Sequence, residues 1–163
     1  MEAPLNWRKD SFLVSTNHSN LEPDAINKAL GSDVIWWAES LSGNQLRTML
    51  QNSLCFGLYK ILEAPDGQDQ MLQIGLARLI TDYVTFCYLT DVYVLDEYQG
   101  KGLGSFLMEC VNEYSNSLPS LRGLMLVTSS EQAQKWYMKL LGAKELETRA
   151  GHPVKALLKE RES

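Results

Sequence analysis

The sequence has few of the residues that build metal centres and disulfide frameworks. It contains three cysteines, two histidines and no Cys-x-x-Cys pair. Zinc centres and disulfide-rich folds need several such residues at short, regular spacings. Cys55, Cys87 and Cys110 are widely separated, and each lies in an apolar segment. We therefore expect buried free thiols of the kind found in reducing compartments, and no metal site.

Positive charge and long apolar runs are also scarce. The 15 lysines and arginines are outnumbered by 20 aspartates and glutamates, which gives a formal net charge of −5 at pH 7. Nucleic acids and anionic membranes bind basic surfaces, so neither is an expected partner. No apolar run approaches the roughly 20 residues needed to cross a bilayer, and charged residues precede the first apolar run. These absences predict a soluble intracellular protein, in the cytoplasm or the nucleus.

What the sequence does contain is enough apolar material for one core. Of its 163 residues 45% are hydrophobic, which predicts a single domain spanning residues 1–163. Strand-like runs occupy residues 54–62, 71–80 and 85–94, and the loop around Gly67 predicts an antiparallel hairpin between the first two. A helical pattern, a short strand at 124–128 and a second helical pattern follow. This order predicts an α/β fold and excludes a repeat array or a helical bundle.

Residues 91–108 form the stretch around which the chain is organised. They run from a β-branched and aromatic segment through a glycine-rich turn into a helical pattern. The apolar residues of that helical face are Leu103, Phe106, Leu107, Cys110, Val111 and Tyr114. Gly100, Gly102 and Gly104 leave the turn without side chains, so backbone N–H groups at the helix start can approach a ligand closely. A phosphate or pyrophosphate is the expected ligand, to which Lys101 adds a positive charge.

Three kinds of glycine-rich anion site differ in the spacing that they need. A dinucleotide-binding fingerprint needs a glycine where this chain has Ser105, and an acidic residue at the end of the next strand, which here ends in Thr-Ser-Ser. A P-loop needs Ser or Thr after the Gly-Lys pair and a glycine five residues before the lysine, where this chain has Gly102 and Asp96. The remaining pattern, Gln/Arg-x-x-Gly-x-Gly/Ala, is met by Gln99, Gly102 and Gly104.

That remaining pattern resembles the coenzyme A pyrophosphate loop of the GNAT acetyltransferases. A second segment, with Ala133, Trp136, Tyr137 and Gly142, is similar to the family's Ala-x-x-aromatic-Tyr…Gly-aromatic motif, although Ala143 stands where an aromatic residue is commoner. The resemblance covers roughly residues 54–146. It implies the GNAT acyltransferase fold, an α/β fold with a mixed, mostly antiparallel sheet flanked by helices. It also implies acetyl-CoA as the cosubstrate and an amine as the acceptor.

The resemblance implies that the coenzyme is held more by backbone groups than by side chains. Main-chain groups at a splayed strand end should pair with the pantetheine arm, and one amide there should polarise the thioester carbonyl. The amides of residues 100–105 should take the pyrophosphate. The implied coenzyme-binding residues are Val92, Tyr93, Val94, Gln99, Gly100, Lys101, Gly102, Leu103, Gly104 and Ser105.

Two side chains are the candidates for catalytic proton transfer. Tyr137 is the candidate acid, because a phenol with an ordinary pKa of about 10 is neutral at pH 7 and can protonate the departing thiolate. Its alternative role is that of a core tyrosine. Asp91 precedes the coenzyme-binding strand end, where it could accept the proton of the amine or attract an ammonium group. Asp91 could equally form a fixed ion pair, and Glu131 is the other reachable carboxylate.

The first fifty residues give weaker signals. An alternating run at 11–16 predicts a strand, residues 23–30 predict a helix that ends at Gly31, and residues 42–50 predict another helix. Between the two helices lie Trp36 and Trp37. Either both tryptophans fill the core, or their loop lines the acceptor pocket, as the family resemblance implies.

The favoured function is N-acetylation of a primary amine, with a small molecule as acceptor, direct attack on acetyl-CoA, and Tyr137 as general acid. Two alternatives stay open. One is acetylation of a protein lysine or N-terminus, and the other is a GNAT-fold module that binds coenzyme A without turnover. The resemblance also leaves open a homodimer that pairs through a C-terminal strand such as residues 153–158.

Overall fold

A computed structural model describes residues 2–162 of the chain. The chain divides into two compact units, one that ends at Val127 and one that begins at Thr128. That the two units together make one domain stays a prediction.

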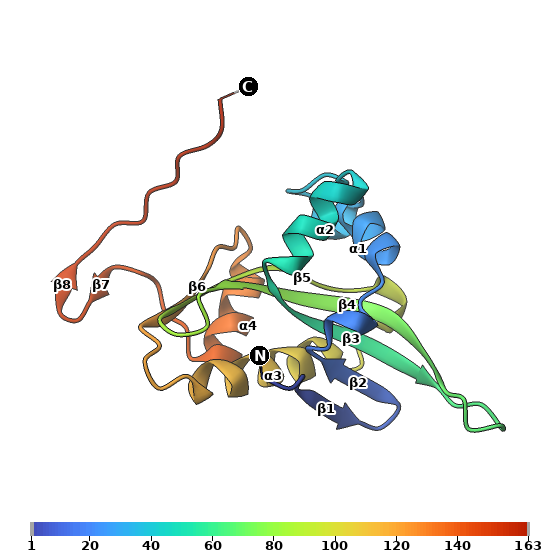
Figure 1. The fold of residues 1–163 in the computed structure, drawn as a ribbon. Helices are drawn as coiled ribbons and strands as arrows, with labels where there is room; N and C mark the ends of the chain where they lie inside the picture. The colour runs from blue at the N-terminus through green and yellow to red at the C-terminus, as the bar shows by residue number, and fades with distance from the viewer. Residues whose placement is uncertain (1, 163) are drawn as a thin grey trace. The chain divides into compact units, whose positions relative to one another are not determined.

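The first unit contains a six-stranded sheet in the order β1-β2-β3-β4-β5-β6 (Figure 1). Its strands are β1 (Asn6–Lys9), β2 (Phe12–Ser15), β3 (Leu54–Leu62), β4 (Gln70–Thr81), β5 (Phe86–Val94) and β6 (Gly123–Leu126). Every neighbouring pair is antiparallel except β5 and β6, which run parallel. The mixed, mostly antiparallel sheet of the sequence prediction is therefore confirmed, with β1 as an additional strand that the prediction did not include.

The helices of the first unit begin and end where the sequence signals predict. They are α1 (Pro23–Leu30), α2 (Gly43–Gln51) and α3 (Leu103–Ser117), and the single 3-10 turns are η1 (His18–Asn20), η2 (Asp33–Ile35) and η3 (Asp96–Tyr98). Gly31 ends α1, and Ser42 and Gln45 form a capping box that starts α2. The whole predicted apolar face of α3 is buried. The helix thereby fixes the position of the glycine-rich turn that precedes it.

The helices cover both faces of the sheet. Adjacent residues of a strand point to opposite faces, and β3 shows which helices lie where. Cys55 belongs to a core cluster with residues of α1, η2 and α2, whereas the ring of Phe56 lies 5.7 Å from that of Tyr114 on α3. Figure 1 shows α1 and α2 on one side of the sheet and α3 on the other. We call the first side the α1/α2 face; Leu76 of β4 and Tyr93 of β5 also lie on it.

The two tryptophans do not fill the core, so that interpretation of the sequence is wrong. The exposed fractions are 69% for Trp36 and 49% for Trp37, and their rings form an edge-to-face pair with centroids 5.6 Å apart. Ile35, the last residue of η2, is fully buried and occupies the core in their place. Because η2 is a single 3-10 turn, it directs one side chain inward and leaves the next two at the surface.

The second unit consists of α4 (Glu131–Leu141) followed by a short hairpin of β7 (Thr148–Arg149) and β8 (His152–Pro153). The Ser130 hydroxyl caps α4 by accepting a hydrogen bond from the amide of Ala133, and Gly142 ends the helix with a φ of +65°. The expected strand at 153–158 is not formed beyond Pro153. Leu157 and Leu158 are almost fully exposed, so no strand of that length offers an edge for pairing.

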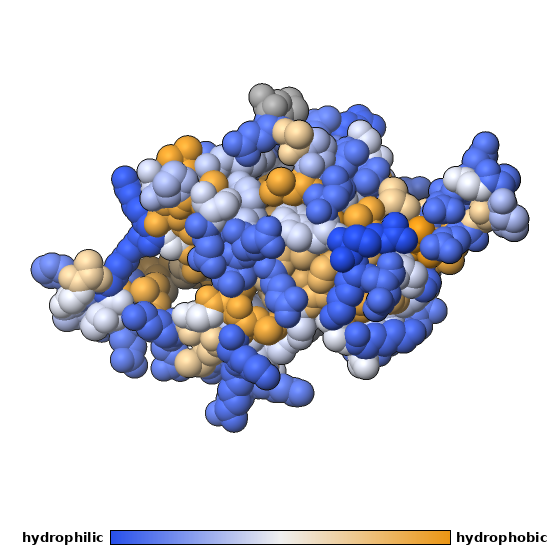
Figure 2. All heavy atoms as spheres, turned by 90° about the horizontal axis from the view of Figure 1, so that it is seen from below, coloured by the Kyte–Doolittle hydropathy of each residue, from blue (hydrophilic) through white to orange (hydrophobic). Residues whose placement is uncertain are grey.

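All three cysteines are free and buried, as the sequence predicts. On the face that Figure 2 shows, hydrophilic residues surround scattered hydrophobic ones. Within residues 2–162, no helix has both the length and the apolar character to cross a membrane.

Candidate active site

β5 extends beyond the end of β6, which pairs with only its first half. The parallel pairing with β6 runs from Phe86 to Leu89, whereas the pairing with β4 continues to Val94. From Thr90 onward the edge of β5 that had faced β6 no longer pairs with that strand. Val92, Tyr93 and Val94 lie in this part, beyond the end of β6 at Leu126, and their role in holding the coenzyme stays a prediction. An extended ligand could pair with main-chain groups along this edge, although the carbonyl oxygen of Val94 already accepts a hydrogen bond from Gln99.

A β-bulge deforms β5 just where it leaves β6. Leu76 pairs with Tyr93, and Arg78 pairs with Thr90. One residue therefore separates the two pairs on β4, whereas two residues separate them on β5. The extra residue lies at Asp91–Val92, and Asp91 has a φ of +51°, in the left-handed region. A bulge bends its strand and redirects the groups on it. Aspartate is among the few residues other than glycine that adopt this conformation readily.

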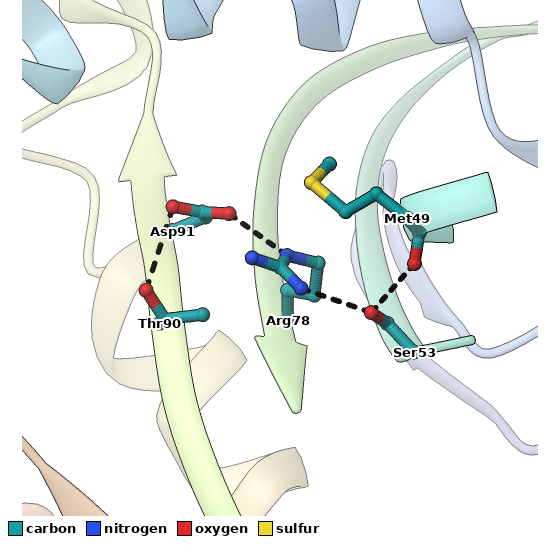
Figure 3. A network of polar contacts seen from close by, with 5 residues as sticks. All are labelled: Met49, Ser53, Arg78, Thr90 and Asp91. Carbon is teal, nitrogen blue, oxygen red and sulfur yellow. Dashed lines mark hydrogen bonds and ion pairs between the residues drawn. The ribbon is translucent and has the colours of Figure 1, made fainter. Parts of the chain in front are cut away.

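The Asp91 carboxylate is held by a buried network of polar side chains (Figure 3). Arg78 Nε donates to Asp91 Oδ2 over 2.8 Å, and Arg78 Nη1 donates to Ser53 Oγ over 2.9 Å. The Ser53 hydroxyl then donates to the carbonyl oxygen of Met49 on α2, and Thr90 Oγ1 donates to Asp91 Oδ1 over 3.4 Å. The side chains of Arg78 and Asp91 are only 11% and 6% exposed. Asp91 therefore takes part in an ion pair, which was one of its two interpretations from the sequence.

The glycine-rich turn presents an uncapped helix N-terminus. Gly102 precedes α3 with a φ of +74°, and no side chain caps the helix. The first backbone bond of the helix runs from the amide of Phe106 to the carbonyl oxygen of Gly102. The amides of Leu103, Gly104 and Ser105 precede this bond and have no partner within the helix. Such amides, together with the helix dipole, favour a bound anion.

The side chains around this turn contact the end of β5 and the 3-10 turn η3 that precedes the glycines. Gln99 Nε2 donates to the carbonyl oxygen of Val94 over 2.9 Å and to Asp96 Oδ1 over 3.1 Å. The ammonium group of Lys101 lies 5.6 Å from the centre of the Tyr98 ring. Leu103 is buried in the core. The backbone amides, rather than these side chains, are the groups that the turn presents to a ligand.

Tyr137 lies in the second unit, on α4. Its ring packs edge-to-face against that of Trp136, with centroids 4.9 Å apart, and burial raises the pKa of its phenol above the ordinary value. The phenol therefore keeps its proton at neutral pH, as a general acid requires. Asp91, the end of β5, the glycine-rich turn and the start of α3 all lie in the first unit, where they follow one another along the chain.

Arg78 and Ser53 belong to the site, and the sequence analysis missed both. A signal for Arg78 was present, because it is the one charged residue in the otherwise apolar strand segment 74–80. Leu76 lies on the α1/α2 face, so strand alternation places Arg78 on that face too. Ser53 follows α2 and has no distinctive spacing.

An open hollow lies on α2. It measures about 410 Å³ and is lined by Asn44, Gln45, Thr48 and Met49. Met49 also provides the carbonyl oxygen that ends the Asp91 network. The exposed tryptophan pair follows Ile35, which packs in the same cluster as Tyr93. Asn44, Gln45 and Thr48 are exposed, so the hollow is open to solvent.

Comparison with known proteins identifies the family. A family model described as an acetyltransferase (GNAT) domain matches residues 65–140. The chain is 43% identical over 137 residues to a Gibberella zeae protein named "Putative acetyltransferase FG08082", covering 78% of this chain and 77% of that protein. A Xanthomonas campestris crystal structure described as a GNAT family member is 35% identical, with a TM-score of 0.62 over 77% of this chain and 82% of that one.

A third protein shows the same fold with its cosubstrate. The crystal structure of a GNAT acetyltransferase from Elizabethkingia anophelis has acetyl-CoA bound; it is 16% identical, with a TM-score of 0.51 over 80% of this chain and 74% of that one. The chain therefore belongs to the GNAT family of acetyl-CoA-dependent N-acetyltransferases.

Proposed function

We propose that this chain transfers the acetyl group of acetyl-CoA to a primary amine of a small molecule. The observation that carries the proposal is the continuous arrangement at the end of β5. The strand leaves β6 after Leu89, bulges at Asp91–Val92, and leads into the uncapped N-terminus of α3. The free strand edge suits the amide-bearing pantetheine arm, and the helix start suits the pyrophosphate.

In the proposed reaction, the amine nitrogen attacks the carbonyl carbon of the thioester directly. A C–N bond forms, the C–S bond breaks, and the negative charge that develops on the carbonyl oxygen needs a fixed hydrogen-bond donor. A backbone amide at the bulge, that of Val92 or Tyr93, is the proposed donor. The amine loses a proton to a base or to water, and the departing thiolate takes a proton from Tyr137. The phenolate then recovers its proton from solvent.

A cationic small amine is the acceptor that the chain favours. The net charge of −5 attracts cations, and the exposed rings of Trp36 and Trp37 can hold an ammonium group through cation–π contacts. The same charge disfavours nucleic acid and anionic membranes as partners, and the buried free thiols suit a reducing compartment such as the cytoplasm.

The test is release of coenzyme A from acetyl-CoA, read with a thiol reagent across a panel of amines and peptides. We expect release that depends on an amine acceptor. In Tyr137→Phe the turnover should fall about 100-fold with unchanged acetyl-CoA affinity, because removal of a general acid typically has effects of this size. The matched control is Tyr83→Phe, in the exposed loop between β4 and β5, which should keep full activity. Full turnover in Tyr137→Phe would contradict the assignment of the acid.

The same panel distinguishes the alternatives. Acetylated peptides identified by mass spectrometry, in the absence of acetylated small amines, would favour a protein acceptor. One observation favours a binding module without turnover: both carboxylate oxygens of Asp91 already accept hydrogen bonds, from Arg78 and Thr90. For such a module, acetyl-CoA would raise the melting temperature while no acceptor became acetylated.

A further inference from the structure

The Arg78–Asp91 pair is buried on a face that is otherwise apolar. Its surroundings on the α1/α2 face include Cys55, Leu76 and Tyr93, each with at most 5% of its surface exposed. Burial raises the pKa of the Cys55 thiol to about 12, so the apolar surroundings are a poor place for an isolated charge. A buried ion pair rarely adds stability over an apolar pair of the same size. Its presence at the bulge therefore suggests a role other than stability.

The pair acts at a residue with an uncommon backbone conformation. Asp91 occupies the left-handed region, a conformation that costs an ordinary residue roughly 1 kcal/mol or more. Its side chain is fixed at both oxygens, by Arg78 from the neighbouring strand and by the adjacent Thr90. Figure 3 shows Asp91 and Ser53 pointing toward Arg78 from opposite sides. Because the carboxylate is fixed, the bulge that carries the Asp91–Val92 peptide is fixed with it.

The network also joins the bulge to α2. Arg78 bonds to Ser53, 25 residues away in the sequence, and Ser53 bonds to the carbonyl oxygen of Met49 near the end of α2. Met49 lines the hollow on that helix. A displacement of α2 would therefore be transmitted to Arg78 and from there to the bulge.

We propose that Asp91 and Arg78 are positioning residues, which hold the backbone amides after the bulge in place for the thioester carbonyl and tie them to α2. This inference rests on the proposed acetyl transfer. Asp91 does not serve as the base in this account, since an incoming amine would first have to displace Arg78 from a side chain that is 6% exposed. A misplacement of reacting groups by about 1 Å can lower a rate on the order of 100-fold, so small movements of the bulge matter.

The experiment compares wild type with Asp91→Asn, Arg78→Gln and the double variant. Asparagine keeps the shape and tolerates the left-handed conformation, so Asp91→Asn is expected to fold. Each single variant should lower kcat about 10-fold to 100-fold, and the double variant should be no worse than the poorer single one, because both act through one unit. The acidic limb of the pH–rate profile should keep its midpoint in Asp91→Asn. Loss of that limb in Asp91→Asn, with Arg78→Gln little affected, would show that Asp91 is the base and overturn the proposal.

Amide hydrogen exchange tests the positioning independently of turnover. In both single variants, exchange at Val92 and Tyr93 should rise at least 10-fold, while exchange in the middle of α3 stays as in the wild type. A uniform rise over the whole first unit would mean that the pair only stabilises the fold. If the wild type shows no turnover but the single variants still show the local rise in exchange, the proposed function is contradicted. The role of the ion pair in holding the bulge would then still stand. Ser53→Ala, which cuts the link to α2 but spares the ion pair, should have the smaller effect on kcat.

Discussion

The two parts of the candidate site, the bulge in β5 and the turn before α3, are built in opposite ways. At the turn, glycines with positive φ and an uncapped helix start offer backbone amides, and the neighbouring side chains only brace the loop. At the bulge, Arg78 of β4 and Thr90 of β5 bond to one aspartate, and Ser53, which follows α2, bonds to Arg78. The turn is specified by a local pattern of residues, whereas the bulge is specified by contacts between distant segments. Mutations should therefore affect ligand binding at the turn and both stability and geometry at the bulge.

The largest effect is expected from removing one partner of the buried ion pair. Asp91→Ala leaves the Arg78 guanidinium buried without its partner, which should lower the free energy of unfolding by about 3 kcal/mol. Urea denaturation measures the change. The matched control is the exposed pair of Arg8 and Glu63, 3.9 Å apart, where Glu63→Ala should cost less than about 0.5 kcal/mol. Equal losses of unfolding free energy in Asp91→Ala and Glu63→Ala would contradict the claim that the buried pair matters more for stability than the exposed one.

The second largest effect is a loss of stability at alkaline pH. It arises from buried thiol and phenol groups and not from the glycine-rich turn. Burial raises the pKa of Cys55 and of Cys110 from 9.0 to about 12, and raises the pKa of Tyr93 as well. Above pH 9 the unfolded chain loses these protons while the folded chain keeps them, so the free energy of unfolding falls as pH rises. Between pH 7.5 and pH 10 we expect a loss of about 1 kcal/mol for each of the two cysteines.

Urea denaturation at the two pH values checks this prediction. The control is Cys55→Ala. In this variant the free energy of unfolding should fall less between pH 7.5 and pH 10, because the contribution of the Cys55 thiol is gone. A denaturation midpoint that does not change between pH 7.5 and pH 10 would show that these thiols are not buried as described.

The smallest effect concerns the turn, where a change should weaken binding and lower the free energy of unfolding by only about 1 kcal/mol. Gly102→Ala puts a Cβ on a residue with a φ of +74°, and the cost is backbone strain because the added atom meets nothing within 4 Å. We expect acetyl-CoA affinity to fall about 10-fold, as measured by calorimetry, because the strained turn shifts its amides. Gly67→Ala is the matched control, with a φ of +76° and the same open surroundings in a hairpin loop. The control should lose a similar amount of stability, about 1 kcal/mol, and no affinity.

The contrast between bulge and turn also explains which features could be predicted from the sequence. The faces of α3, the strand boundaries and the glycine turn follow from the spacing of residues close together in the chain, so they were predicted. The role of Arg78 depends on Asp91 and Ser53, 13 and 25 residues away, and no local spacing reports such contacts. Trp36 and Trp37 were equally ambiguous, because an aromatic pair fits a core as well as a surface until the 3-10 turn at η2 fixes its direction.

An NMR titration of the backbone amides with acetyl-CoA tests the central claim most directly. If β5 and the start of α3 hold the coenzyme through their backbone, the amide signals of Val92, Tyr93, Leu103, Gly104 and Ser105 should shift together along one binding curve. The amide of Gly67, which has the same backbone conformation as Gly102, should stay in place. Binding of acetyl-CoA that leaves these five amides unshifted would contradict the account.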